Sequence, residues 1–233
     1  HPLVETGGRL GTTSVAGAPF GSGHILTISH SYICMMGSDG LTRATKYAIL
    51  NANYVSVSLK NWYKTLYTGT TGFVAHELIL DCRNFKTEAG ITESDIAKRL
   101  MDYGFHAPTL SFPVHGTLMV EPTESESLQE LDKFIDALKS VWNEINEIRE
   151  GKADKEDNVL RNAPHTAKAV TANEWNHSYD RQKAGFPLKW VSENKFWPSV
   201  GRIDDGYGDR NLICTCDPID AYRTENLNFF LLK

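Results

Sequence analysis

The chain has 233 residues, with 24 Lys and Arg against 29 Asp and Glu, so its formal net charge is −5 at pH 7. Hydrophobic residues make up 41% and charged residues 23%, which is typical of a globular protein of one large or two small domains. This charge gives no broad basic surface, and the apolar run Phe229–Leu232 falls far short of the roughly 20 residues of a spanning helix. We therefore expect neither nucleic acid nor a membrane as a partner.

The N-terminal part is predicted to be a loop followed by two helices. Residues 1–24 are rich in Gly, Thr, Ser and Pro, which favours a loop. An apolar stretch from His24 to Met36 ends at Gly37, which is typical of a helix with a glycine stop. A second helix is predicted for Gly40–Leu59, where the apolar positions fit a buried stripe only loosely.

The middle of the chain alternates between strand and helix patterns. Phe73–Asp81 is an apolar run that predicts a strand. Thr92 is predicted to be the N-cap of a short helix, and Asp95 is the acid at the third helical position. This helix is predicted to end at Gly104. Gly116–Val120 predicts a second short strand.

The clearest helical period follows this second strand. Thr123–Glu126 has the spacing of a capping box, and the helix that it opens is predicted to end at Gly151. The order strand, helix, strand, helix predicts an α+β fold with the helices on one face of a small sheet. The apolar positions of the long helix recur at i, i+3, i+4 and i+7: Leu128, Leu131, Phe134, Ile135, Leu138, Val141, Trp142, Ile145 and Ile148.

The C-terminal part shows no sustained period. Residues 152–164 read as a charged connector, and residues 165–210 as an irregular segment that wraps over the rest. A turn at 206–210 is predicted to enter a short strand at Asn211–Thr215. Four aromatic side chains are expected to attach this segment: Trp175, Trp190, Phe196 and Trp197.

The cysteines and histidines give no signal for a metal or redox site. Four cysteines are too irregularly spaced for a disulfide scaffold, and Cys214-Thr215-Cys216 lacks the C-x-x-C spacing. We expect reduced thiols. The eight histidines are scattered, and His76 and Glu77 lie in the predicted strand, where neighbours face opposite sides. No metal ligand is therefore assigned.

Three acids cluster in Glu121–Glu126, and two interpretations apply to them. Paired carboxylates are a known arrangement for acid–base catalysis, whereas acids in the first turn of a helix stabilise its dipole. Capping accounts for Glu124 and Glu126 without any catalysis, and we favour it.

Several strings of this sequence resemble the P-protein of the glycine cleavage system, the pyridoxal-phosphate-dependent glycine dehydrogenase (decarboxylating). The resemblance runs in order from His1 to about Tyr222. It is carried by five strings: Ser31–Gly37, Ala48–Tyr54, Lys98–His106, Gly116–Glu126 and Tyr207–Cys216.

The resemblance implies the C-terminal portion of a fold-type-I pyridoxal-phosphate enzyme. Residues 1–68 would be the end of the cofactor domain with its linking helices, 69–151 the α+β small domain, and 152–233 a wrapping segment. The implied reaction decarboxylates glycine and transfers the aminomethyl group to the lipoyl group of H-protein. Lipoylated H-protein, glycine and a second P-protein subunit are therefore the expected partners.

This chain departs from the family in ways that affect its activity. The family holds its cofactor lysine in a Ser/Asn-x-His-Lys stretch, and no His-Lys pair occurs here, so the Schiff-base lysine is absent. We expect the chain alone to be inactive, and no residue is assigned a catalytic role. The alternative is a non-catalytic interaction or subunit-interface module. The start at His1-Pro2-Leu3, without Met or leader, reads as a processed, excised or truncated chain.

The resemblance also implies a role for one loop and a cellular compartment. The family's Gly/Ser-rich loop corresponds to Gly11–Ser22, here with two extra residues and with Phe20 in place of Trp. The hydroxyls of Thr12, Thr13 and Ser14 are the candidates to reach the cofactor phosphate; a simple linker is the alternative. The Cys-Thr-Cys string resembles eukaryotic members and implies the mitochondrial matrix. Residues 224–233 match nothing in the family.

Overall fold

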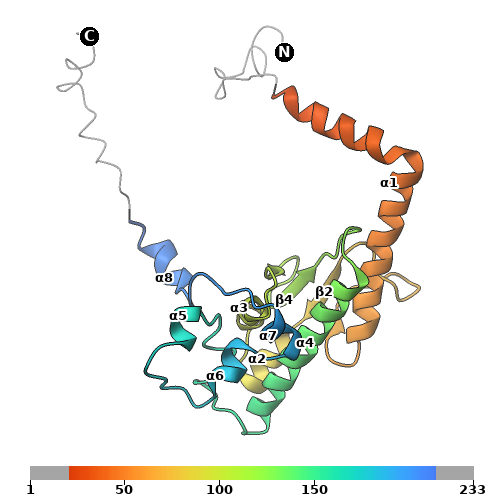
Figure 1. Ribbon diagram of the computed structural model, residues 1–233. Helices are drawn as coiled ribbons and strands as arrows, with labels where there is room; N and C mark the ends of the chain where they lie inside the picture. Colours follow the sequence, from red (N-terminus) through yellow and green to blue (C-terminus); the bar gives the residue numbers. More distant parts are fainter. Residues whose placement is uncertain (1–20, 214–233) are drawn as a thin grey trace, which may run out of the picture.

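The computed structural model describes residues 21–213, shown in Figure 1 with colours that follow the sequence. Its elements are α1 (His24–Leu59), β1 (Lys64–Thr65), β2 (Leu78–Asp81), α2 (Arg83–Ala89), α3 (Glu93–Asp102), β3 (Thr109–Leu110), β4 (Thr117–Val120), α4 (Leu128–Arg149), α5 (Ala167–Val170), α6 (Arg181–Gly185), α7 (Lys189–Glu193) and α8 (Asp205–Arg210).

The strands form one small antiparallel sheet in the order β1-β2-β4-β3. Its centre is the pair β2 and β4, where Leu80 lies opposite Leu118 and both side chains are fully buried. Helix α1 packs against β2, and α3 packs against β3 and β4. The predicted α+β fold is confirmed as a small domain with a four-stranded antiparallel sheet.

Helix α4 supplies the largest apolar face of the core and packs against α1, α2 and α3. Its buried side chains follow the predicted period, and the helix ends before Gly151, whose φ of 70° only glycine adopts readily. Leu128 is the exception, because it lies at the first position of the helix and is 62% exposed. The buried apolar residues are Leu131, Ile135, Ala137, Leu138, Val141, Ile145 and Ile148.

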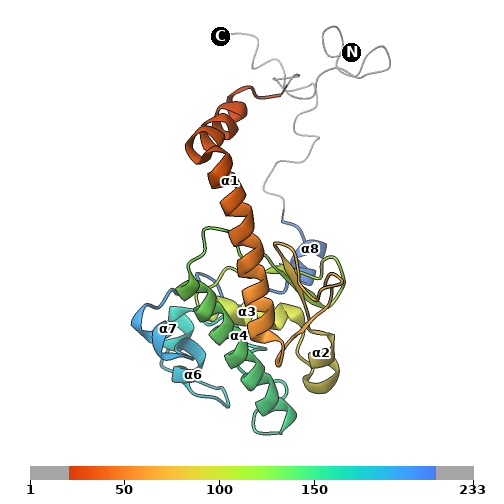
Figure 2. The same ribbon diagram turned by 90° about the vertical axis from the view of Figure 1, so that its right-hand side faces the viewer.

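Helix α1 is bent at Gly37, so the two predicted helices are confirmed as two halves of one element. Gly37 has φ 63° and ψ −179°, a backbone conformation essentially limited to glycine. The C-terminal half packs through Asn51, Ala52, Val55 and Leu59, whereas the N-terminal half extends away from the body (Figures 1 and 2). No helix within residues 21–213 has the length and apolar character needed to cross a bilayer.

The predicted strand Phe73–Asp81 is only half correct, since pairing begins at Leu78. The backbone of Val74 has another partner: its N–H donates to Asn53 Oδ1 at 2.9 Å, and its carbonyl accepts from Asn53 Nδ2 at 2.8 Å. The backbone of Val74 is thus bonded to α1 instead of to another strand. Phe73, at the start of the predicted strand, is 60% exposed.

The capping prediction holds for α3 and is wrong for α4. Thr92 and Asp95 form the reciprocal capping box that the sequence indicates. Helix α4 begins four residues later than predicted, with Ser127 Oγ accepting from the N–H of Glu130 at 3.2 Å. Thr123 is held in a loop instead, because its carbonyl accepts from Asn51 Nδ2 of α1 at 2.8 Å.

A set of three alanine substitutions tests these caps. Thr92→Ala and Ser127→Ala are each expected to lower the free energy of unfolding by about 1 kcal/mol, because each leaves a helix N–H without its side-chain acceptor. Thr123→Ala is the control, with an expected change within about 0.5 kcal/mol. Urea denaturation followed by circular dichroism measures all three. A larger loss for Thr123→Ala than for Ser127→Ala would contradict the observed start of α4.

The C-terminal segment wraps over α3 and α4 as short helices joined by loops. Trp190 packs on the core and lies 6.1 Å from the Phe105 ring, and Trp197 lies 5.4 Å from the Phe186 ring. The prediction is wrong for Phe196, which is 73% exposed.

A helix replaces the predicted turn at 206–210. Helix α8 is capped by Asp204, whose Oδ1 accepts from the N–H of Tyr207 at 2.8 Å. Asn211 is the C-cap of this helix, and residues 211–213 form no strand. The rest of the predicted strand, residues 214 and 215, lies outside the described residues.

Candidate functional site

The loop after β4, Glu121–Glu126, separates two hollows on the surface, and we name it the acidic loop. One hollow, of about 380 Å³, lies between this loop and α1; we call it the α1 hollow. The other, of about 320 Å³, lies between the loop, β4 and the start of α4, and we call it the phenylalanine hollow. Glu121 and Pro122 line both hollows, so one short segment contributes to two candidate binding sites.

His76, Glu121 and Glu124, which the sequence analysis singled out, line the α1 hollow. His76 Nε2 lies 3.8 Å from Glu121 Oε1 and 4.0 Å from Glu77 Oε2. The expectation that His76 and Glu77 face opposite sides is therefore wrong, since residues 73–77 form no strand. The His76 and Glu121 side chains are 56% and 54% exposed, so both are available to a ligand or to another polypeptide.

Three polar contacts hold the walls of the α1 hollow in place. Asn51 fixes the acidic loop through the carbonyl of Thr123, and Asn53 fixes the segment before His76 through the backbone of Val74. Tyr54 donates to Asp132 Oδ1 at 2.6 Å and so joins α1 to α4. All three donors lie within about one turn of α1, which makes this part of the helix the frame of the hollow.

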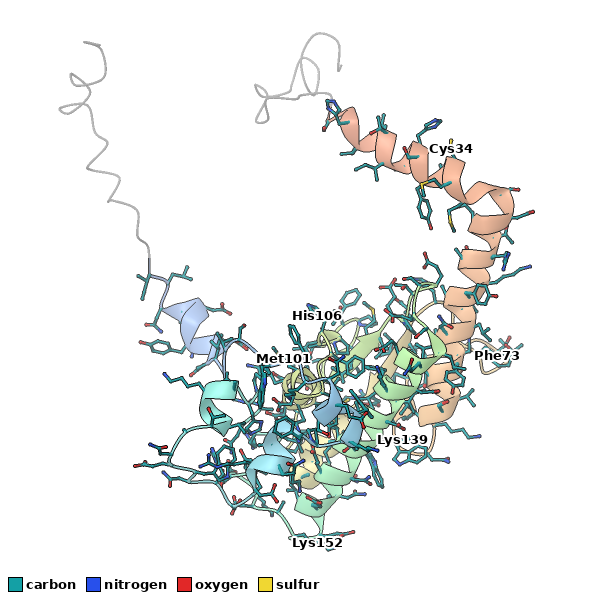
Figure 3. All side chains as sticks on the ribbon, in the orientation of Figure 1. Cys34, Phe73, Met101, His106, Lys139 and Lys152 are labelled. Carbon is teal, nitrogen blue, oxygen red and sulfur yellow. The ribbon has the colours of Figure 1, made fainter. Side chains whose placement is uncertain are left out.

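The phenylalanine hollow has an apolar floor and a polar rim. Phe105 and Phe134 meet edge to face at 5.3 Å between ring centroids, and Met119 and Leu131 complete the floor. The rim carries His106, Glu121, Glu126 and Glu130. Figure 3 labels His106 at the upper edge of the body.

A buried ionic network attaches the C-terminal segment to α3 and α4. The guanidinium of Arg99, which is fully buried, donates to Glu144 Oε1 at 2.7 Å and to Asp102 Oδ2 at 2.8 Å. It also donates to the carbonyls of Lys183 and Ala184 in α6, at 2.8 and 2.9 Å. Charged residues of this kind are rarely buried unless paired, and the sequence alone gave no sign of this network.

His165 extends this network towards the surface. Its backbone N–H donates to Asp102 Oδ1 at 2.6 Å, and its Nδ1 lies 2.8 Å from Asp102 Oδ2. On the other side of the ring, Nε2 lies 2.9 Å from the hydroxyl of Tyr179, and burial raises the pKa of that hydroxyl. The chain Tyr179, His165, Asp102 resembles a proton relay, but neither hollow beside the acidic loop reaches it. Its hydrogen bonds join the C-terminal segment to α3.

Residues 21–213 do not fit pyridoxal phosphate as a complete site. This cofactor needs a lysine beside partners for its ring and phosphate. Lys195 comes nearest: its pKa is lowered to about 8, mainly by burial, while Asp102 opposes the shift and Arg99 adds to it. However, Lys195 Nζ donates to the backbone carbonyl of Asp102 and lies over the Trp197 ring, outside both hollows. The part of the chain described here also holds no group of three metal-binding side chains.

The lowered pKa of Lys195 predicts a pH dependence of stability. Its pKa is about 8 in the folded chain, below the ordinary lysine value of 10.5, so the unfolded chain binds more protons between these values. Stability conferred by this group must therefore rise from pH 8 to pH 10.5. The difference in urea midpoint between wild type and Lys195→Met is expected to shift in favour of wild type over this range. A constant difference would contradict the prediction.

The sequence-predicted cofactor residues cannot be placed. Thr12, Thr13 and Ser14 lie outside the described residues, as do Cys214 and Cys216. Cys34 is exposed on α1 and Cys82 is buried, and both are free thiols.

The fold and the site define a small α+β domain that carries a long protruding helix and two hollows beside one acidic loop. Residues 44–165 match the family described as glycine dehydrogenase, C-terminal domain. Since this match covers more than half of the chain, the chain belongs to that family, and the resemblance stated from the sequence is confirmed.

Curated relatives in bacteria carry the name glycine dehydrogenase (decarboxylating), which is the name of an enzyme. The chain is 61% identical to the Nostoc punctiforme protein over 209 residues, which is 90% of this chain and 21% of that protein. It is 56% identical to the Flavobacterium johnsoniae protein and 58% identical to a Bacteroides fragilis protein, covering 95% and 92% of this chain and 23% of each relative. The chain thus spans about a fifth of the length of these relatives.

These organisms overturn the expected compartment. The mitochondrial matrix was inferred from a likeness of the Cys-Thr-Cys string to eukaryotic members. The relatives found here come from Nostoc, Flavobacterium and Bacteroides, which are bacteria and have no mitochondria.

Proposed function

We propose that the chain acts as the C-terminal portion of a pyridoxal-phosphate-dependent glycine decarboxylase of fold type I. In this role the complete enzyme decarboxylates glycine and passes the aminomethyl group to the lipoyl group of H-protein. The observation that supports it best is the family match over 44–165, which covers the second half of α1, the sheet and α4. The division into residues 1–68, 69–151 and 152–233 is part of this proposal.

In this proposal the Schiff-base lysine and most of the cofactor site belong to the part of the relatives that the chain does not match, and Thr12, Thr13 and Ser14 add contacts to the cofactor phosphate. Two facts support this: residues 21–213 do not fit the cofactor, and the relatives are several times longer than the chain. When bound, pyridoxal phosphate supplies an electron sink for the decarboxylation. We assign the α1 hollow, with His76 and Glu121, as the surface of this chain that faces the cofactor-bearing part.

A chimeric enzyme tests the proposal. The matching segment of the Nostoc punctiforme protein is replaced by this chain, and glycine-dependent exchange of labelled CO₂ is measured with lipoylated H-protein. The chimera is expected to exchange CO₂, whereas the 233-residue chain alone is expected to show no exchange above background. Exchange of labelled CO₂ by the chain alone would contradict the proposal. A chimera that folds and binds cofactor but exchanges no CO₂ would also contradict it.

A non-catalytic interaction module is the second candidate, and the N-terminal half of α1 favours it. Apolar side chains on this half are widely exposed, from 54% at Ile33 to 86% at Met35. Clusters of this kind mark interfaces with other polypeptides. In this reading the chain contributes to the subunit interface or receives H-protein. Retention of lipoylated H-protein by the immobilised chain, without cofactor, would support it; no retention and a monomer by sedimentation equilibrium would exclude it.

A further inference from the structure

The phenylalanine hollow combines features that the proposed function does not use. Its floor is apolar, from the edge-to-face pair Phe105 and Phe134, with Met119 and Leu131 beside them. Three carboxylates stand on its rim: Glu121 follows β4, Glu126 precedes α4, and Glu130 lies in the first turn of α4. The hollow measures about 320 Å³.

The rim carries more negative charge than its neighbours balance. Glu130 pairs with Lys133 at 2.6 Å, and His76 Nε2 lies 3.8 Å from the Glu121 carboxylate. Within residues 21–213, the carboxylate of Glu126 makes no hydrogen bond or ion pair. The N-terminus of α4 adds roughly half a positive charge, so three carboxylates still exceed the positive charge beside them. An apolar floor under a negative rim is complementary to a group that is apolar along its length and positive at its end.

A lysine side chain has this chemistry. Its four methylene groups can lie on the aromatic floor while the ammonium stays at the rim. Its ammonium donates in three directions, which suits carboxylates at three positions of one continuous segment, residues 121–130, whereas a planar guanidinium pairs best with one carboxylate. Free glycine is a poor occupant, because its own carboxylate would meet the negative rim.

We propose that the phenylalanine hollow binds a lysine side chain presented by a partner polypeptide. The charge complementarity of the rim and the apolar floor together specify this occupant. The proposal concerns a surface of the folded chain and does not depend on the proposed decarboxylase function.

Three probes test the chemistry by nuclear magnetic resonance of the full chain. n-Butylammonium mimics the lysine side chain, 1-butanol has the same stem without charge, and acetyl-Ala-Lys-Ala-amide presents a lysine on a polypeptide. We expect n-butylammonium to shift the amide signals of 105–109 and 119–121 in a saturable way, at least fivefold more tightly than 1-butanol. The peptide is expected to bind no more weakly than n-butylammonium. Equal binding of the alcohol, or failure of the peptide to bind, would overturn the proposal.

Two matched variants show whether the rim is responsible. Glu126→Gln keeps the size of the side chain and removes the charge that lacks a partner, and it is expected to weaken n-butylammonium binding about fivefold. Asp209→Asn removes an exposed acid on α8, away from the hollow, and is expected to leave binding unchanged. Glu126 lies in an exposed loop, so the variant is expected to fold. If both variants weakened n-butylammonium binding equally, the binding would reflect only a general attraction of cations to the negative chain. This result would contradict a specific site in the phenylalanine hollow.

Discussion

Arg99→Met is expected to lower the free energy of unfolding by about 3–5 kcal/mol, the cost typical of breaking a buried ion pair from one side. The guanidinium is fully buried and donates to Glu144, to Asp102 and to two carbonyls of α6. Methionine fills much of the volume but leaves two buried carboxylates without their cation. The C-terminal segment would then lose one of the contacts that join it to α3 and α4, while those from His165 and Lys195 to Asp102 remain.

Urea denaturation measures the loss of unfolding free energy in Arg99→Met, and two further variants show where this loss comes from. Arg83→Met removes a cation that pairs with Asp81 at the surface, and it is expected to leave the urea midpoint nearly unchanged. Adding Glu144→Leu to Arg99→Met is expected to recover part of the loss, because it removes one of the unpaired buried charges. If Arg99→Met were as mild as Arg83→Met, the network would carry none of the stability assigned to it.

Leu138→Ala is expected to cost about 2–5 kcal/mol, because it leaves a cavity where α4 meets the rest of the core. Leu138 is fully buried, and its backbone carbonyl accepts from the hydroxyl of Tyr63, which is also buried. The surrounding core collapses only partly into such a space.

Leu128→Ala is the matched control on the same helix. Leu128 belongs to the same apolar period in the sequence but is 62% exposed, so its truncation is expected to change stability by about 0.5 kcal/mol or less. Urea midpoints of both variants give the comparison. Equal losses would mean that the N-terminal turn of α4 is covered in solution, contrary to the observed packing.

Most of the helical fold could be predicted from the sequence. The bend at Gly37, the box of Thr92 and Asp95, and the end of α4 before Gly151 each depend on residues within a few positions of one another. Local backbone preferences and the 3.6-residue period therefore suffice to predict them.

The sequence indicated several residues of the candidate site but not that they lie together. The strings Lys98–His106 and Gly116–Glu126 were each singled out, but nothing in either indicates that Phe105 and Glu126 line one hollow. His76 was placed in a strand and is instead close to Glu121, which is far along the chain. A hollow depends on which segments meet, and the meeting is decided by packing.

The sequence by itself determined the family, the order of the two central strands and of the helices α1, α3 and α4, and the apolar face of α4, because these depend on composition and on neighbours along the chain. Only the tertiary structure decided where β2 and α4 begin and which charges are buried. Asn51 reaches Thr123 across 72 positions and Arg99 reaches Glu144 across 45. Such bonds replace local capping and strand pairing because a buried polar group must find a partner wherever the fold brings one.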